Sequence, residues 1–268
     1  WNGSSWTEVG DLNTARQYIA TAGTNASALA VGGNPAPGSA VTESWNDTAW
    51  TEIAEMNATR ERASGFGASN TSALVFGGLV PGNPRTGATE LWNGTSWSED
   101  GDLSTARSLL GSTKGPVTSG LAFGGGTPDD TAATEEWQAA GASIGAWSTG
   151  ASLNTARSAK TGAGTYTAAL MFASDQTAND ELNESFNGTA WTEVGDLNTG
   201  MVKSTGFGAT NTAAIRTTGD NGPGYSGITE QWNGTSWTAV NSTNQAREQV
   251  GSVSGTVTAG LIFGGQGP

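Results

Sequence analysis

One phrase recurs along the whole chain and constrains its fold more than any other feature. A Trp, or once a Phe, precedes a turn-forming stretch, most often Asn-Gly, at six places that are 44 to 49 residues apart. These residues mark repeats starting near 1, 45, 92, 137, 186 and 232: Trp1, Trp45, Trp92, Trp137, Phe186 and Trp232. A second Trp follows, then a segment like Asp-Leu-Asn-Thr-Ala-Arg, an apolar triplet that usually ends in Gly-Gly, and Thr-Glu-x-Trp. A unit of this kind cannot bury its apolar face alone, so neighbouring copies must stack.

Each repeat predicts four short strands and no helix. Residues 88–92 and 96–100 flank Asn93-Gly94, a dipeptide that readily adopts the positive φ angles of a type I′ hairpin turn. Residues 108–115 and 119–125 predict a second hairpin. Four strands repeated at about 45 residues are typical of a propeller blade. We therefore expect one all-β domain over residues 1–268, a six-bladed β-propeller of four-stranded antiparallel blades.

The number of copies of each strand predicts how the ring closes. The Thr-Glu-x-Trp strand occurs five times, whereas the other three strands of the unit occur six times. We expect the N-terminal strand around Trp6 to join the last blade, beside the strand that ends at Phe263-Gly264. The sixth copy of the Thr-Glu-x-Trp strand is unaccounted for.

The Gly-Gly pair, the Glu and Trp of Thr-Glu-x-Trp, the second Trp and the Arg of Asn-Thr-Ala-Arg occur in one order and at one spacing. Together they resemble kelch repeats, and the resemblance covers the whole chain. Copies this similar to one another also resemble the kelch-type arrays encoded by phages and environmental bacteria. The second resemblance favours a virion or extracellular location.

The composition argues against catalysis. The chain contains no His and no Cys, which removes the commonest general base, the commonest transition-metal ligand and all thiol chemistry. Galactose-oxidase-like kelch propellers need copper-binding His and a Cys-linked Tyr. Six-bladed sialidases carry Asp boxes, an Arg triad and a Tyr nucleophile, but no such box occurs here and the Tyr are few: Tyr18, Tyr166 and Tyr225. We expect no enzymatic activity and no cofactor.

The charge limits the class of partner. The formal net charge of −13, from 11 basic and 24 acidic residues, would repel nucleic-acid phosphates and anionic lipid. We expect neither nucleic acid nor membrane as a partner, and a domain that is monomeric unless it belongs to a larger assembly.

An Arg and a Glu each recur once per repeat. The arginines are Arg16, Arg60, Arg107, Arg157 and Arg247, with Met201 at the remaining position. The glutamates are Glu43, Glu90, Glu135, Glu184 and Glu230. A guanidinium could grip a carboxylate or a sulfated glycan, but a charge repeated in every copy is better explained by pairing with the equally repeated Glu. We expect both rings to be structural, and the paired Trp to pack between blades rather than bind sugars.

The loops after Gly-Gly vary most in length and chemistry. They span residues 34–41, 79–88, 126–133, 175–182 and 219–227. In a blade of consecutive hairpins they share one face with the Asn-Thr-Ala-Arg connections. Variable loops on a rigid repeated scaffold commonly carry recognition, although unselected drift would give the same pattern. We predict a non-catalytic recognition module for a glycan or protein receptor, such as the head of a phage fibre or surface protein, with these contact residues: Arg85, Asp129, Asp130, Asn221 and Tyr225. The alternative is a protein–protein interaction scaffold that binds no glycan.

Some stretches depart from the repeat. The acidic segment 175–184 offers oxygen ligands suited to Ca²⁺ from Asp175, Asn179, Asp180, Glu181 and Glu184, but it lacks EF-hand spacing, so we predict a solvated loop and no metal. Ala173-Ser174 and Thr218-Gly219 replace Gly-Gly, and Arg216 stands where other copies have an apolar residue or Ala. Five extra residues within 138–146 lengthen one hairpin, on the face opposite the variable loops.

Overall fold

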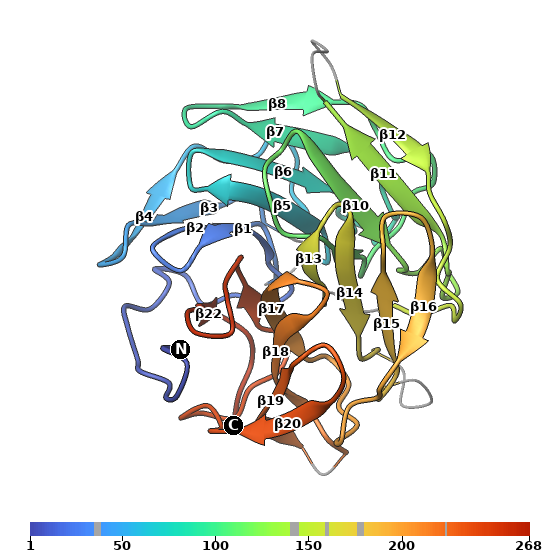
Figure 1. Cartoon of the computed structure of the whole chain (residues 1–268). Coiled ribbons are helices and arrows are strands. Elements are labelled where there is room, and N and C mark those ends of the chain that lie inside the picture. Colours follow the sequence, from blue (N-terminus) through green and yellow to red (C-terminus); the bar gives the residue numbers. More distant parts are fainter. Residues whose placement is uncertain (35–38, 140–144, 159–160, 176–179, 223) are drawn as a thin grey trace.

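The computed structural model of the chain describes residues 1–268 except 35–38, 140–144, 159–160, 176–179 and 223. The described residues contain strands, turns and bends but no helix. They form five four-stranded antiparallel sheets and one two-stranded sheet (Figure 1). The protein is therefore an all-β propeller, and we number its four-stranded sheets blades 1 to 5 in chain order.

The strands of each blade follow one another in sequence order, so every blade is a meander. Blade 1 contains β1 (Ala20–Thr24), β2 (Ser27–Val31), β3 (Thr42–Trp45) and β4 (Trp50–Ile53). Blade 2 contains β5 (Ser64–Ser69), β6 (Ser72–Phe76), β7 (Thr89–Trp92) and β8 (Trp97–Asp100). Blade 3 contains β9 (Gly111–Ser112), β10 (Ser119–Phe123), β11 (Thr134–Gln138) and β12 (Ala146–Thr149). Blade 4 contains β13 (Ala163–Thr165), β14 (Ala168–Phe172), β15 (Asn183–Phe186) and β16 (Trp191–Val194). Blade 5 contains β17 (Thr205–Thr210), β18 (Ala213–Asp220), β19 (Tyr225–Trp232) and β20 (Trp237–Val240), and the two-stranded sheet contains β21 (Gly251–Ser252) and β22 (Ile262–Phe263).

The first strands β1, β5, β13 and β17 lie towards the middle of the ring (Figure 1), and β9 and β21 contact β5 and β17 there. Hydroxyl groups tie these inner strands together: Thr21 Oγ1 donates to Ser252 O at 2.6 Å, and Thr205 Oγ1 to Ser252 Oγ at 2.9 Å. The backbone of Ser254 also donates to Gly23 O at 2.8 Å, which joins the two-stranded sheet to blade 1. The inner ring is thus closed between the last sheet and the first.

The N-terminal residues lie against the two-stranded sheet. Trp1 N donates to Gly260 O at 3.0 Å and Gly260 N to Trp1 O at 3.2 Å, so these two residues exchange both backbone hydrogen bonds. The stretch around Trp6, which the sequence predicts as a strand, is not assigned as one. The reason is physical: the fourth strand of each blade pairs only with the third, and Trp6 has no described third strand beside it.

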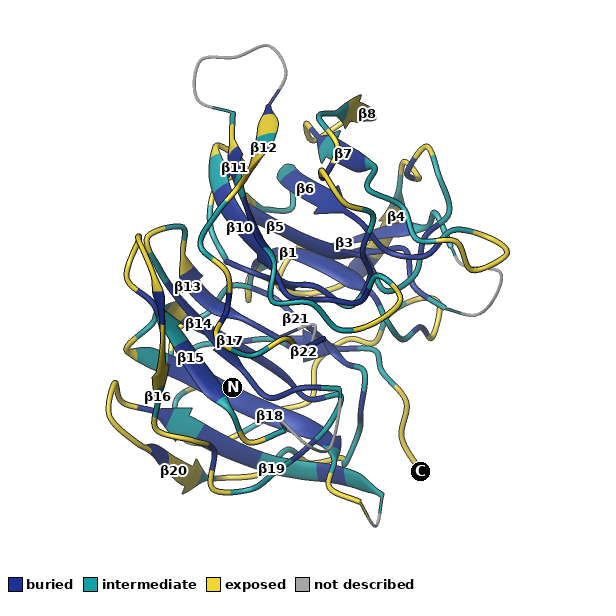
Figure 2. Cartoon of the chain, turned by 90° about the vertical axis from the view of Figure 1, so that its right-hand side faces the viewer, coloured by how far each residue is buried: buried dark blue, intermediate teal, exposed yellow. Residues whose placement is uncertain are grey.

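Aromatic side chains pack between neighbouring blades, whose strands are mostly buried (dark blue in Figure 2). Within a blade the two Trp of the hairpin lie together, as in Trp45 and Trp50, whose ring centroids are 5.4 Å apart. The second Trp also meets an aromatic ring of the preceding sheet edge-on: Trp191 lies 5.0 Å from Phe123 of blade 3. These contacts hold neighbouring blades together.

The Asn-Gly hairpins differ from the predicted two-residue type I′ turns. Trp92 pairs with Trp97, so the loop of this hairpin has four residues, Asn93–Ser96. Only Gly94 has a positive φ, of 94°, whereas a type I′ turn needs two such residues. Asn93 Oδ1 instead accepts hydrogen bonds from the backbone of Thr95 and Ser96, at 2.9 and 3.0 Å. The asparagine therefore caps the loop with its side chain.

The Gly-Gly pairs bring the end of the second strand against the Arg of the next blade. Gly32 has φ 63°, and a Cβ there would lie 2.6 Å from Arg60 O. Ala173, which replaces the first Gly in blade 4, keeps a φ of 62° despite its side chain. The local conformation of the repeat thus survives the loss of the glycine.

Candidate functional site

Four of the repeated arginines form buried ion pairs with the repeated glutamates. Arg16 Nη2 lies 2.8 Å from Glu43 Oε1, and Arg107 Nη2 lies 2.8 Å from Glu135 Oε1. The other two pairs are Arg157 with Glu184, at 2.9 Å, and Arg60 with Glu90. All eight side chains are at most 4% exposed.

Each pair also satisfies backbone groups. Arg107 Nη1 donates to Gly124 O at 2.7 Å and to Ala133 O at 2.8 Å, while Glu135 Oε2 accepts from Ser104 N at 2.7 Å. The pair thereby fastens the Asp-Leu-Ser-Thr-Ala-Arg segment to the second and third strands of its blade. Burial lowers the pKa of Arg107 from its ordinary value, and the charge and hydrogen bond of Glu135 oppose that shift. These guanidinium groups are shielded from solvent.

Blade 5 builds the same ion pair from a different position. Met201 occupies the repeat's Arg position and is fully buried, while Arg216 projects from β18. Arg216 lies directly opposite Glu230 in the strand pairing, and its Nη2 lies 3.3 Å from Glu230 Oε1. The sequence shows both departures, but only the structure shows that one compensates for the other.

Arg247 is the repeated arginine that differs in its surroundings. Its Nη1 donates to Gly264 O at 3.2 Å, which matches the bond from Arg107 to Gly124. No carboxylate of the described residues lies within ion-pair distance of it. Burial lowers the pKa of Arg247, opposed by the charges of Asp11 and Glu8.

A rim of side chains surrounds the axis on the face that carries the variable loops. In each repeat, the residue two positions after the repeated Arg (or after Met201) has a φ between 54° and 56° wherever it is described. These residues are Tyr18, Arg62, Leu109, Lys203 and Gln249. Their backbones form hydrogen bonds from blade to blade, such as Arg62 N to Tyr18 O at 3.1 Å and Leu109 N to Arg62 O at 3.0 Å. We call this set the axial rim.

The axial rim presents polar and cationic groups on a fixed backbone. The Arg62 guanidinium stacks on the Tyr18 ring, 4.5 Å from its centroid, and Gln249 Nε2 donates to Tyr18 OH at 2.6 Å. Lys203 Nζ lies 3.1 Å from Glu248 Oε2. The side chains of Arg62 and Lys203 are 35% and 32% exposed, so both remain open to solvent. Sequence reasoning missed this set because the residue type varies at the position and positive φ at a non-glycine residue leaves no sequence signal.

The predicted contact residues fall into two groups on the loop face. Arg85 Nη2 lies 3.4 Å from Pro128 O, which brings the blade 2 loop beside Asp129 and Asp130 of the blade 3 loop. Asp129 is exposed, whereas Arg85 and Asp130 are half-buried.

The second group lies on blade 5. Tyr225 OH accepts from Gln266 Nε2 at 2.8 Å, and Asn221 is exposed in the adjoining turn. Blade 4 separates this group from Arg85 (Figure 1), so the structure does not gather the five predicted residues into one site.

The acidic segment 175–184 lies partly outside the described residues, and Asn179 is among those left out. Glu184 is committed to its ion pair with Arg157 and to Asn154, whose backbone donates to Glu184 Oε2 at 2.7 Å. Across the described part of the chain, no cluster of acidic side chains has the arrangement to hold a metal ion. The lengthened hairpin at 138–146 is also only partly described; its Gly145 N donates to Asp100 Oδ1 of blade 2 at 2.7 Å.

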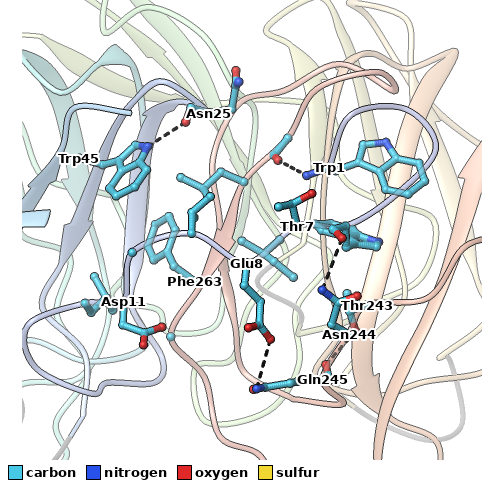
Figure 3. Close-up of a pocket in the computed structure, with 18 of the residues that line it drawn as sticks. Trp1, Thr7, Glu8, Asp11, Asn25, Trp45, Thr243, Asn244, Gln245 and Phe263 are labelled. Atoms are coloured by element: carbon cyan, nitrogen blue, oxygen red, sulfur yellow. Dashed lines mark hydrogen bonds between the residues drawn. The ribbon is translucent and has the colours of Figure 1, made fainter. Parts of the chain in front are cut away.

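One cavity lies beside the two-stranded sheet, at the N-terminal segment (Figure 3). It has a volume of about 450 Å³ and is lined by Trp1, Trp6, Trp45, Glu8, Arg247 and residues 260–264, among others. None of the predicted contact residues lines it.

A narrower cavity of about 20 Å³ lies on the axis among the inner strands. Lys114 reaches into it, and its Nζ lies 3.3 Å from Ser252 O. Burial lowers the pKa of Lys114 to about 8.

Within the described ranges there is no helix long and apolar enough to span a bilayer. Neither a protein-family model nor any curated protein matches the chain. The assignment of the fold therefore depends on the sheets and their arrangement.

Proposed function

We propose that this chain is a non-catalytic recognition module that binds a glycan or protein receptor on its loop face. The observation that carries the proposal is the axial rim, where Tyr18, Arg62 and Lys203 stand partly exposed on a backbone that is hydrogen-bonded from blade to blade. Aromatic and guanidinium groups supply much interface energy per residue, and a rigid backbone reduces the entropy lost on binding. The rim shares its face with the loops that hold Arg85, Asp129, Asp130 and Tyr225.

We also propose that the propeller is a six-bladed kelch-type ring, with the two-stranded sheet as its sixth blade. Three features support this: the six copies of the repeat, the hydrogen bond from Gln249 N to Lys203 O at 3.2 Å, and that from Tyr18 N to Gln249 O at 3.4 Å. Gln249 thus occupies its own place in the axial rim, between blades 5 and 1. The N-terminal residues pack against this blade from the other end of the chain.

The class of partner follows from charge and composition. An acidic chain without His or Cys suits neither nucleic acid, nor anionic membrane, nor the usual catalytic chemistries. The likeness of its copies to phage-encoded arrays favours a virion or extracellular setting.

The test is a glycan array, together with host-surface extracts, probed with labelled protein. Two double variants address the loop face: Tyr18→Phe with Arg62→Gln at the rim, and Arg85→Ala with Tyr225→Ala in the loops. Tyr166→Ala is the matched control, because Tyr166 lies in the turn between β13 and β14 on the opposite face and bonds to Glu136 at 2.7 Å. Loss of binding in either loop-face variant but not in the control supports the proposal.

Loss only in the Tyr166 control would place the site on the wrong face. Binding to a host protein without any glycan signal would favour the alternative, a protein–protein interaction scaffold.

A further inference from the structure

We propose that the cavity of about 20 Å³ on the axis is a binding site for one monatomic anion, such as chloride. The Lys114 ammonium and backbone amides of the inner strands would hold the ion. We call this space the axial cavity. The site goes beyond the proposed recognition on the loop face and does not depend on it.

Lys114 occupies a position at which the other four complete blades have glycine. The strand registers equate it with these residues: Gly23, Gly67, Gly164 and Gly208. A Cβ at Gly23 would lie 2.0 Å from Ser27 O, so blade 1 has no room for a side chain there. The packing of the repeat therefore does not require a lysine at this position, and its presence in blade 3 calls for another reason.

The Lys114 side chain reaches from blade 3 to the two-stranded sheet. Its backbone N–H donates to Gly164 O of blade 4 at 2.8 Å, which fixes the start of the side chain. Its Nζ donates to Ser252 O at 3.3 Å. An ammonium group has three N–H donors, and among the described residues Nζ has no second acceptor. The group can therefore donate to a further ligand in the axial cavity.

The described residues supply no counter-charge for this ammonium group. None of their carboxylates lies within ion-pair distance of Lys114. The buried Arg107 differs, because the charge of Glu135 opposes the lowering of its pKa by burial. Burial lowers the pKa of Lys114 without any opposing charge. A buried charge without a partner is costly, and a bound anion would reduce that cost.

Backbone amides of the inner strands also face the axial cavity. Val253 N donates to Leu261 O within the two-stranded sheet, at 3.3 Å. Because antiparallel strands alternate in the direction of their hydrogen bonds, the N–H and C=O of the preceding Ser252 point the other way, towards the axis. Thr21 and Gly65 have the equivalent register in blades 1 and 2, so their amides face the axis as well.

Hydroxyl groups cover the carbonyl oxygens at this level and leave the amides. Ser252 O accepts from Thr21 Oγ1 at 2.6 Å, and Gly65 O accepts from Ser112 Oγ at 3.0 Å. The amides of Thr21, Gly65 and Ser252 line the cavity, and among the described residues they have no acceptor in another sheet. No acidic residue lines the cavity. It therefore presents a cation and hydrogen-bond donors, as anion-binding sites do.

The volume of the axial cavity limits the ion. A single water needs a cavity of about 10–15 Å³, so about 20 Å³ holds one monatomic ion and is too small for phosphate, sulfate or a sugar carboxylate. Lys114 is half-buried and lies between β9 and β10, at the end of the axis opposite the loop face. The ion would enter from that end.

The experiment replaces methanesulfonate by chloride, up to about 0.2 M at constant ionic strength, so that screening of surface charges stays the same. It compares the wild type with Lys114→Met. The matched control is Lys203→Met, which removes the same charge from the loop face, where Lys203 pairs with Glu248. The readouts are the Tm and the amide chemical shifts of Gly65 and Ser252.

We expect chloride to raise the wild-type Tm by several degrees, because it binds the folded state, and to shift both amides along a one-site curve. Lys203→Met should respond as the wild type does, and Lys114→Met should lose both responses. In methanesulfonate alone, Lys114→Met should be the more stable protein, and chloride should narrow that difference. An equal rise of Tm in Lys114→Met, or unshifted amides in the wild type, would overturn the proposal.

A crystal of the wild type grown with bromide locates the ion without any variant. An anomalous peak within hydrogen-bond distance of Lys114 Nζ supports the proposal. The absence of that peak, at a bromide concentration that saturates the rise of Tm, contradicts it. Glycan-array binding reports on the loop face alone, so the two proposals fail separately.

Discussion

Arg216 lies 3.3 Å from Glu230 and replaces, from the neighbouring strand, the arginine that Met201 displaces in blade 5. Blade 4 has these residue types the other way round: Arg157 stands at the position that corresponds to Met201, and Met171 on β14 stands at the position that corresponds to Arg216. Arg and Met have therefore exchanged positions between blades 4 and 5, and the buried glutamate of each blade, Glu184 or Glu230, still pairs with an arginine. The exchange is imperfect, because Arg216 Nη1 has no hydrogen-bond partner among the described residues.

Restoring the repeat in blade 5 tests this compensation. Arg216→Met alone would leave Glu230 buried without its cation, which typically costs about 3–5 kcal/mol. Met201→Arg with Arg216→Met should recover the free energy of unfolding to the wild-type value or above it, because Nη1 then gains the carbonyl partners seen in other blades. Urea denaturation of the wild type, the two single variants and the double variant gives the coupling free energy between positions 201 and 216. Additive losses would show that the two positions are independent.

Arg107→Met copies the natural Met201 at a ring position that has no compensating arginine. Glu135 would stay buried and unpaired, so we expect a loss of about 3–5 kcal/mol. Binding of any ligand found on the array should persist at temperatures where the variant is folded. Lost binding with an unchanged free energy of unfolding would instead make Arg107 a contact residue.

The period of the repeat was enough to predict a propeller of four-stranded blades. Hydrophobic alternation and turn residues are local signals, and each was present in several copies. The strands β7 (Thr89–Trp92) and β8 (Trp97–Asp100) fall within one residue of their predicted bounds. The number of blades was harder to predict than their strand order. The sixth sheet has only two assigned strands, and residues from both ends of the chain contribute to it.

The features that could not be predicted depend on side chains that meet in space. The hairpin at Asn93 was predicted as a type I′ turn, but the capping by its amide allows a four-residue loop. The Arg216–Glu230 pair requires knowledge of strand register. The axial rim requires the φ of Tyr18 and Arg62, which no local pattern encodes. The Arg216–Glu230 pair and the axial rim depend on tertiary structure, whereas the Asn93 cap is a local side-chain-to-backbone interaction.

Deletion of residues 1–10 tests the closure of the ring. It would remove Trp1 from Gly260 and Trp6 from Phe207, whose ring centroid lies 6.3 Å away, and would leave the backbone of Gly260, beside β22, without its partner. Exposed edges pair with other chains, so we expect a sharply lower Tm or oligomers in light scattering. A monomeric product with an unchanged Tm would show that the N-terminal segment does not close the ring.

Lys114 makes stability depend on pH above neutrality. Burial on the axis lowers its pKa from 10.5 to about 8, so the unfolded chain holds this proton up to a higher pH than the folded chain does. Between about pH 8 and 10.5 the unfolded state therefore binds more protons, and this group makes the free energy of unfolding rise with pH. Below pH 8 the cost of the buried charge is present in full.

Lys114→Met should thus stabilise the protein at pH 7, and its advantage over the wild type should shrink as the pH approaches 10. Burial raises the pKa of Tyr18, which acts in the opposite direction at high pH but equally in both proteins, so the difference between them isolates Lys114. Urea denaturation of both proteins from pH 6 to 10 measures that difference, and a constant value across the range would show that Lys114 is solvated in the folded state.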